Sequence, residues 1–173
     1  AAAHSRLPAR RTVSLVARDP LISQDRAPLA VAAVSGLVAG VAYVAIQAVD
    51  IRLTGRKVDD LVALGRFVTG DNQAARRLGL GLHLANSVVL ALVYGKVQAK
   101  LPGPPWARGM LFTMAENSLL YPIMALEDKH PAIRDGSLDR YWNWPAFMQS
   151  IPRHLVYGAV LGVLDEKLRG RHW

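Results

Sequence analysis

The 173-residue chain has the length of one ordinary domain, a net charge of +8 and no cysteine. The lack of cysteine excludes disulfides, Cys-ligated zinc, iron–sulfur clusters and thiol nucleophiles. The basic charge would suit nucleic acid, but the basic residues flank apolar runs and no DNA- or RNA-binding motif occurs. We therefore expect no nucleic-acid partner and, instead, contact with a membrane surface.

The charges are clustered along the chain, although the mean hydropathy is only +0.17. Between the clusters lie four nearly uncharged runs, at residues 28–49, 78–95, 109–126 and 146–164. A helix that crosses a bilayer needs about 20 apolar residues, with ~17 as the lower limit, whereas the helices of soluble bundles have polar outer faces. The sequence therefore predicts an all-α, integral membrane four-helix bundle over residues 28–165, with a soluble helical binding domain as the alternative.

Residues 1–27 hold five arginines, few acids and no long apolar run. We expect a basic N-terminal tail without a cleavable secretory signal; a transit peptide is the alternative, because such segments are also rich in Arg and Ser. In the first span that follows, Gly36 and Gly40 form a GxxxG pair, which predicts close packing against another helix.

The first connection, residues 50–77, contains the segment VDDLVALGRFV at residues 58–68, whose apolar positions recur at helical spacing. This pattern predicts an amphipathic helix at the membrane interface or across the end of the bundle, although Gly65 inside the segment disfavours a helix. Asp71 stands where the N-cap of the second span is expected.

The second connection, KVQAKLPGPPWARG, is short and broken by prolines, so we expect the second and third spans to form an antiparallel hairpin. The third connection ends in Tyr141, Trp142 and Trp144, and such aromatic residues are typical of the membrane–water interface. Residues 166–173 are expected to form a short basic C-terminal tail.

The distribution of Lys and Arg predicts the orientation in the membrane. The N-terminal tail, the second connection and the C-terminal tail together hold 11 of them, and the first and third connections hold 9. The side with the excess of Lys and Arg is the cytoplasmic side. We therefore expect a multi-pass protein of the cell inner membrane with both termini in the cytoplasm.

Six polar side chains interrupt the last three spans at depths of about 8–15 Å, at ~1.5 Å per residue. They are His83, Asn86, Glu116, Asn117, Arg153 and His154. Ionisable groups at membrane depth usually face a partner or a cavity. We expect an intramembrane polar cluster in which Glu116 pairs with Arg153 or His154. On the face of His154, Gly158 and Gly162 form a second GxxxG pair and predict a second close helix contact.

Three interpretations of this polar cluster stay open. It is a structural cluster that fixes the register of the helices, a site for a small ligand, a proton or a lipid headgroup, or a metal or haem site that uses His83 and His154. The sequence contains no HExxH motif, no pair of Glu-x-x-His motifs and no recognisable catalytic motif. We therefore name no catalytic residue and no resident metal, and the sequence favours a protein that is not an enzyme.

Four segments carry a family likeness: the Gly/Ala-rich AVSGLVAG, the span LGLHLANSVVLALVYG, the hairpin LPGPPWARG and the final span RHLVYGAVLG. With them, residues 29–164 resemble the uncharacterised bacterial inner-membrane proteins related to YagU. The resemblance implies a four-helix membrane fold and no established chemistry, so it supplies no catalytic residues.

The function that these features favour is non-catalytic. We expect a small accessory or scaffold subunit that packs against other membrane helices, against a second copy of itself, or against lipids. The alternative is a membrane protein that binds a small ligand, a proton or a cofactor (metal or haem) through Glu116, His83 and His154.

Overall fold

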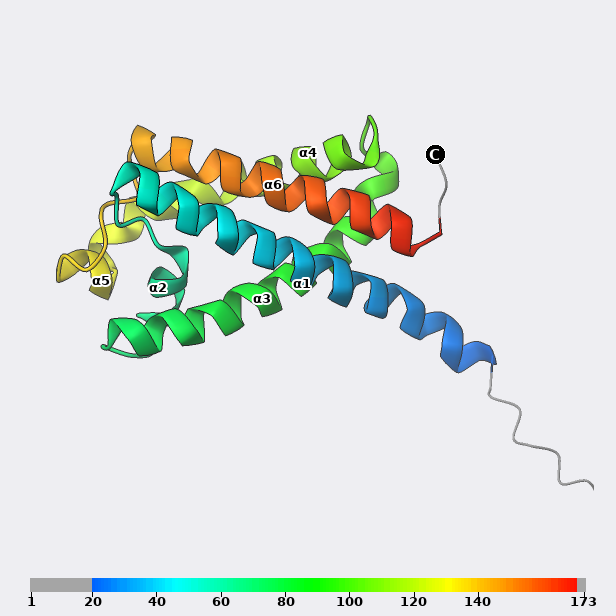
Figure 1. Cartoon of the computed structure of the whole chain (residues 1–173), viewed down its shortest axis with the longest axis horizontal. Helices are drawn as coiled ribbons and strands as arrows, with labels where there is room; N and C mark the ends of the chain where they lie inside the picture. Colours follow the sequence, from blue (N-terminus) through cyan, green and yellow to red (C-terminus); the bar gives the residue numbers. More distant parts are fainter. Residues whose placement is uncertain (1–19, 171–173) are drawn as a thin grey trace, which may run out of the picture.

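A computed structural model describes the backbone of residues 20–170 and the side chains of residues 28–170. Most of the predicted N-terminal tail, residues 1–19, and the last three residues of the C-terminal tail lie outside the described part. Within that part the chain is all-helical (Figure 1). The α-helices are α1 (Pro20–Thr54), α2 (Asp60–Gly65), α3 (Asn72–Val97), α4 (Pro105–Leu120), α5 (Pro131–Arg134) and α6 (Trp144–Leu168), and the 3₁₀ segments are η1 (Gln98–Lys100) and η2 (Tyr121–Lys129).

Local signals explain where several helices begin. Asp71 is the N-cap of α3, and its carboxylate accepts the backbone N–H of Ala74 at 2.7 Å. Asp59 caps α2 and Asn143 caps α6 in the same way. Helix α4 begins with Pro105 at a position where a missing N–H costs nothing.

The third uncharged run does not form one continuous α-helix. Helix α4 ends at Leu120, and the chain continues as the 3₁₀ segment η2. Pro122 explains the change, because it has no N–H to donate to Ser118 and its ring crowds that carbonyl. In the first connection, the amphipathic helix is shorter than the pattern suggested, since α2 has only six residues.

The four long helices form a row rather than a closed bundle. Helix α3 packs along α1, α1 along α6, and α6 along α4, but α3 and α4 are not packed along each other (Figure 1). Although consecutive in the chain, α3 and α4 diverge from η1, and α3 packs against α2 instead. The N-terminal end of α1 and the C-terminal end of α6 lie at one end of the molecule, and α2 and α5 lie at the other.

Glycines make the close contacts between these helices. On α1, a Cβ at Gly36 would stand 2.6 Å from the Ser87 carbonyl oxygen of α3. On α6, a Cβ at Gly158 would collide with Thr113 and Gly109 of α4. Gly40 faces α3 and Gly162 faces α4 in the same manner. Both GxxxG pairs therefore lie at helix–helix contacts, where backbones approach each other directly.

Among the helices of residues 20–170, two are long and apolar enough to cross a membrane. The segments are Pro28–Thr54, with a mean hydropathy of 2.3, and Asn72–Lys100, with 1.6. Only 33% and 22% of their most apolar stretches are buried inside the protein, whereas the apolar core helix of a soluble protein is mostly buried. The exposed surfaces of α1 and α3 are rich in Leu and Val, which supports association with a membrane.

Candidate binding pocket and its polar floor

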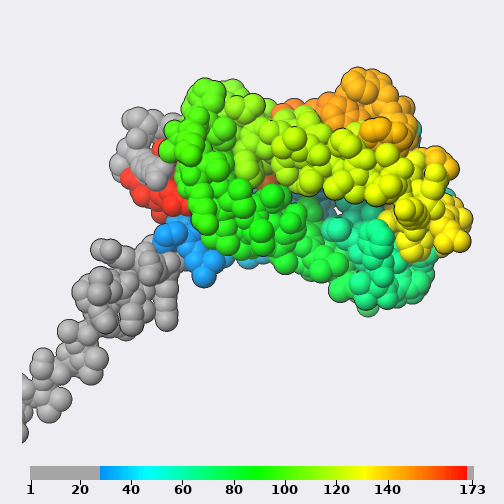
Figure 2. All heavy atoms as spheres, turned by 180° about the vertical axis from the view of Figure 1, so that it is seen from behind, coloured from blue at the N-terminus to red at the C-terminus, as the bar shows by residue number. Residues whose placement is uncertain are grey.

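A pocket of about 540 Å³ lies at the end of the molecule that carries α2 and α5. Its walls come from α2, the end of α4, η2, α5 and α6, and none of the lining residues belongs to α3. Seen from behind, the surface is hollowed between the yellow-green α4–η2 segment and the teal α2 (Figure 2). The walls are mainly apolar; the side chains that form them include Leu64, Phe67, Leu120, Ile123, Met124 and Ile133.

The floor of the pocket is polar and reaches the middle of the helices. Its side chains are Tyr43, Asp60, Glu116, Asn117, Arg153 and His154. Four of the six residues of the predicted intramembrane cluster therefore lie at this floor. They come from α4 and α6, while Tyr43 and Asp60 are contributed by α1 and α2.

Arg153 is the centre of a buried network of charges, and its side chain is only 1% exposed. Its Nε donates to Asp50 of α1, and its Nη1 donates to Asp60 of α2 at 2.8 Å. The remaining nitrogen, Nη2, donates to the Val58 carbonyl oxygen at 3.0 Å. All three guanidinium nitrogens are therefore satisfied, as a buried charge requires.

The network extends to the N-terminus of α2. Asp59 accepts a hydrogen bond from Gln47 at 3.0 Å and pairs with Arg76 of α3 at 2.9 Å. Tyr43 donates its hydroxyl to Asp60 at 2.8 Å. These contacts join α1, α2, α3 and α6, so the short α2 is fixed by charge as well as by its apolar face.

Glu116 and His154 form a separate pair, with 3.6 Å between Oε2 and Nε2. The Nδ1 of His154 lies 2.8 Å from the Ser150 carbonyl oxygen, which can only accept, so the geometry assigns the proton to Nδ1. The Nε2 atom then faces Glu116. Two neighbours on α4 also contact α6: Thr113 donates to the His154 carbonyl at 2.8 Å, and Asn117 donates to Ser150 at 2.9 Å.

His83 lies beside this floor without lining it. Its Nε2 is 3.3 Å from the Gly40 carbonyl oxygen, and its ring packs on Tyr43 with 4.8 Å between centroids. The ring of His154 also packs on Tyr43, with 5.2 Å between centroids. The single ring of Tyr43 therefore contacts both imidazoles.

Asn86 does not join the cluster, so this part of the expectation is wrong. The side chain is exposed on the outer surface of α3, and within residues 28–170 it has no hydrogen-bond partner. The reason is the rotation of α3, which turns Ser87 toward Gly36 and Gly40 of α1. Its neighbour Asn86, about 100° further round the helix, then points outward.

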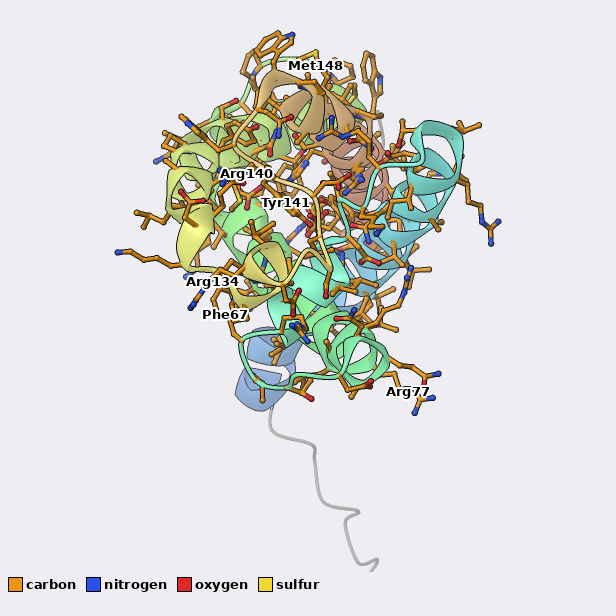
Figure 3. All side chains as sticks on the ribbon, turned by 90° about the vertical axis from the view of Figure 1, so that its left-hand side faces the viewer. Phe67, Arg77, Arg134, Arg140, Tyr141 and Met148 are labelled. Carbon is orange, nitrogen blue, oxygen red and sulfur yellow. The ribbon has the colours of Figure 1, made fainter. Side chains whose placement is uncertain are left out.

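The loop that precedes α6 closes the outer end of the pocket. Glu127 of η2 accepts the backbone N–H of Trp142 at 2.9 Å and pairs with Arg140 at 3.2 Å. Figure 3 looks at this end and shows Arg140 and Tyr141 on the loop, with Phe67 on the chain after α2. Burial raises the pKa of the Tyr141 hydroxyl well above its usual value.

Residues 27–172 match the model of a family described as a family of unknown function, DUF6789. The chain belongs to the DUF6789 family. No curated protein and no solved structure matches it. The DUF6789 match includes every residue of the pocket and of the charged network.

The DUF6789 chain shows no three-residue metal site: within residues 28–170, no group of three His, Cys, Asp or Glu side chains is placed to hold a metal ion. His83 and His154 each direct a nitrogen at a backbone carbonyl, and both pack on Tyr43. The arrangement therefore gives no observation in favour of a haem or metal between these two residues.

Sequence reasoning missed three members of the site in this DUF6789 chain. Tyr43 lies within the first uncharged run, Asp50 directly follows that run, and Asp60 lies in the first connection. A buried guanidinium needs carboxylate partners, and the Asp-rich segment after the first span was the available signal. The sequence did not indicate that the first connection folds back against α6.

Proposed function

We propose that this DUF6789 chain is a four-span membrane protein that binds a small amphiphilic molecule without catalysing a reaction. The observation that supports it is the pocket, whose volume of about 540 Å³ lies within the roughly 300–1,000 Å³ typical of ligand sites. Apolar walls over a floor with a few polar groups suit a molecule with a hydrophobic body and a polar head.

In this proposal four segments cross the membrane: α1, α3, α6, and α4 continued by η2. The 25 residues of α6 span about 37 Å, and the 16 residues of α4 span about 24 Å before η2 adds its length, against a hydrocarbon core of ~30 Å. The resemblance to the YagU-related proteins supports the same assignment. Exposed Trp142 and Trp144 at the start of α6 suit the interface.

The proposed location is the cell inner membrane, with both termini in the cytoplasm. The shared end of α1 and α6 supports two termini on one side (Figure 1), and the excess of Lys and Arg favours the cytoplasm for that side. The pocket then lies near the opposite face of the membrane. We expect a membrane-dissolved molecule to enter from the side between α3 and α4, because these helices diverge and α3 lines no part of the pocket.

Ile123→Trp provides a test, because the larger side chain fills the pocket from its wall. Native mass spectrometry of the protein, released from detergent, is expected to show a bound amphiphile on the unmodified chain and none on Ile123→Trp. Leu119→Trp is the matched control, since Leu119 is 78% exposed and does not line the pocket. Equal ligand occupancy in the two variants, or no bound molecule in any of the three proteins, would refute the proposal.

A role as an accessory subunit is the second candidate, and Asn86 favours it. The outer face of α3 is apolar around this exposed amide, with Leu82 and Val89 exposed beside it. An amide facing hydrocarbon lacks hydrogen-bond partners, which a neighbouring membrane helix can supply. Asn86→Leu is expected to lower the mass of the detergent-purified assembly, and an unchanged mass would count against this role.

A further inference from the structure

The polar atoms that remain open at the pocket floor are hydrogen-bond acceptors. The side chains of Asp60, Glu116 and His154 are 26%, 20% and 17% exposed, so each reaches the pocket. Within the described residues, no hydrogen bond engages Oδ1 of Asp60 or Oε1 of Glu116. The Nε2 of His154 carries a lone pair, because the proton is on Nδ1.

Two of the donor groups at the floor, on Arg153 and Tyr43, are already used. Arg153 donates from all three of its nitrogens, and Tyr43 donates its hydroxyl to Asp60. The hydroxyl oxygen of Tyr141 is buried and not open to the pocket. Lys129, the one lysine along the wall, is exposed at the end of η2. A ligand at the floor therefore meets the open acceptors of Asp60, Glu116 and His154, while Arg153 and Tyr43 donate to protein atoms.

The charge of the floor and its network is negative. Four carboxylates are present, and two guanidinium groups, Arg76 and Arg153, offset them. The carboxylates are Asp50, Asp59, Asp60 and Glu116. Within the described residues Glu116 is the member that has no guanidinium partner, and it faces the neutral imidazole of His154. A negative site with low water access favours a cation.

We propose that the pocket takes a lipophilic cation, meaning a protonated amine on a hydrophobic body, whose ammonium donates to both Glu116 and His154 from the pocket side. This assignment rests on the proposed function of the pocket. An ammonium has three N–H donors and no acceptor, which complements a floor of free acceptors. The two acceptors that it would join are 3.6 Å apart, and the apolar walls cover the hydrophobic body.

Decylamine, 1-decanol and decanoate test the assignment, since they share one chain and differ in the head group. Like the lysine side chain, the amine is protonated at pH 7. Binding to the full chain in a non-ionic detergent is measured by titration calorimetry, with the thermal midpoint as a second readout. We expect the amine to bind at least tenfold more tightly than the alcohol, and the carboxylate to bind most weakly.

Glu116→Gln removes the unpaired carboxylate and keeps its shape. We expect the Kd for decylamine to rise at least tenfold and the Kd for decanol to change less than twofold. Asp128→Asn is the matched control: Asp128 is 70% exposed, pairs with Arg140 and does not line the pocket, and we expect it to leave both values unchanged.

The possible failures are distinguishable. If decanol or decanoate binds as tightly as decylamine and Ile123→Trp abolishes that binding, the pocket function stands and the cation assignment is wrong. If no probe binds, both proposals fail. The comparison of head groups uses the unmodified chain. It therefore tests the cation assignment even if Glu116→Gln fails to fold.

Discussion

Arg153 has two carboxylate partners from elements that are distant in the chain. Its guanidinium is almost fully buried between Asp50 and Asp60, and it does not depend on Glu116 for charge compensation. Asp50, which does not line the pocket, and Glu116, which does, can therefore be changed separately.

Arg153→Ala leaves Asp50 and Asp60 without their shared cation. We expect the free energy of unfolding to fall by about 3–5 kcal/mol, the usual cost of breaking a buried ion pair from one side. Reversible unfolding in mixed micelles measures it. In a double-mutant cycle with Asp50→Asn, we expect a coupling energy of roughly 0.5–3 kcal/mol; additive effects would show that this ion pair does not form.

Glu116→Gln is expected to change the free energy of unfolding by less than about 1 kcal/mol, because the side chain is partly exposed to the pocket and faces the neutral imidazole of His154. The same unfolding experiment applies. A loss as large as that of Arg153→Ala would mean that Glu116 is a structural member of the network, and would remove the basis for using this variant in the binding test.

The contact between α2 and α3 depends on two glycines. A Cβ at Gly65 would collide with the Ala75 backbone, and one at Gly79 would collide with the Leu61 carbonyl oxygen. Gly65 disfavours a helix in isolation, but it allows this short helix to approach α3. The close approach of the α2 and α3 backbones explains why α2, with only six residues, keeps a defined position against α3.

Gly79→Ala is expected to destabilise the protein by about 1–3 kcal/mol, the usual cost of inserting atoms into a packed contact. Gly81→Ala is the control on the same helix, because a Cβ there meets nothing within 4 Å. We expect this change to be neutral or to stabilise by up to about 1 kcal/mol through helix propensity. Thermal unfolding of both variants in one detergent makes the comparison, and equal effects would contradict the α2–α3 contact.

The sequence allowed the N-cap at Asp71 to be predicted, because capping depends on neighbours within one turn. It also allowed Glu116 to be assigned His154 as a candidate partner, since helical spacing and depth are local properties. The partners of Arg153 could not be predicted, because they depend on where the first connection folds. The outward position of Asn86 depends on a rotation of α3 that only the packing against α1 determines.

The ends of α1 and α6 that lie together at one end of the protein lead to a topology experiment (Figure 1). A reporter that is active only in the cytoplasm, fused after Trp173, is expected to be active. The same reporter inserted at Gly136, an exposed turn with φ +75°, is expected to be inactive. Equal activity at the two positions would exclude an arrangement in which α6 crosses the membrane.

The divergence of α3 from α4 affects which molecules form the walls of the binding site. With three seams between the long helices instead of four, the side between α3 and α4 is not closed by helix packing along its length. In a bilayer, acyl chains would complete that side, so the lipid would act as part of the receptor. Ligand affinity would then vary with acyl-chain length and saturation at constant protein sequence, and values measured in micelles and in bilayers would describe two different sites.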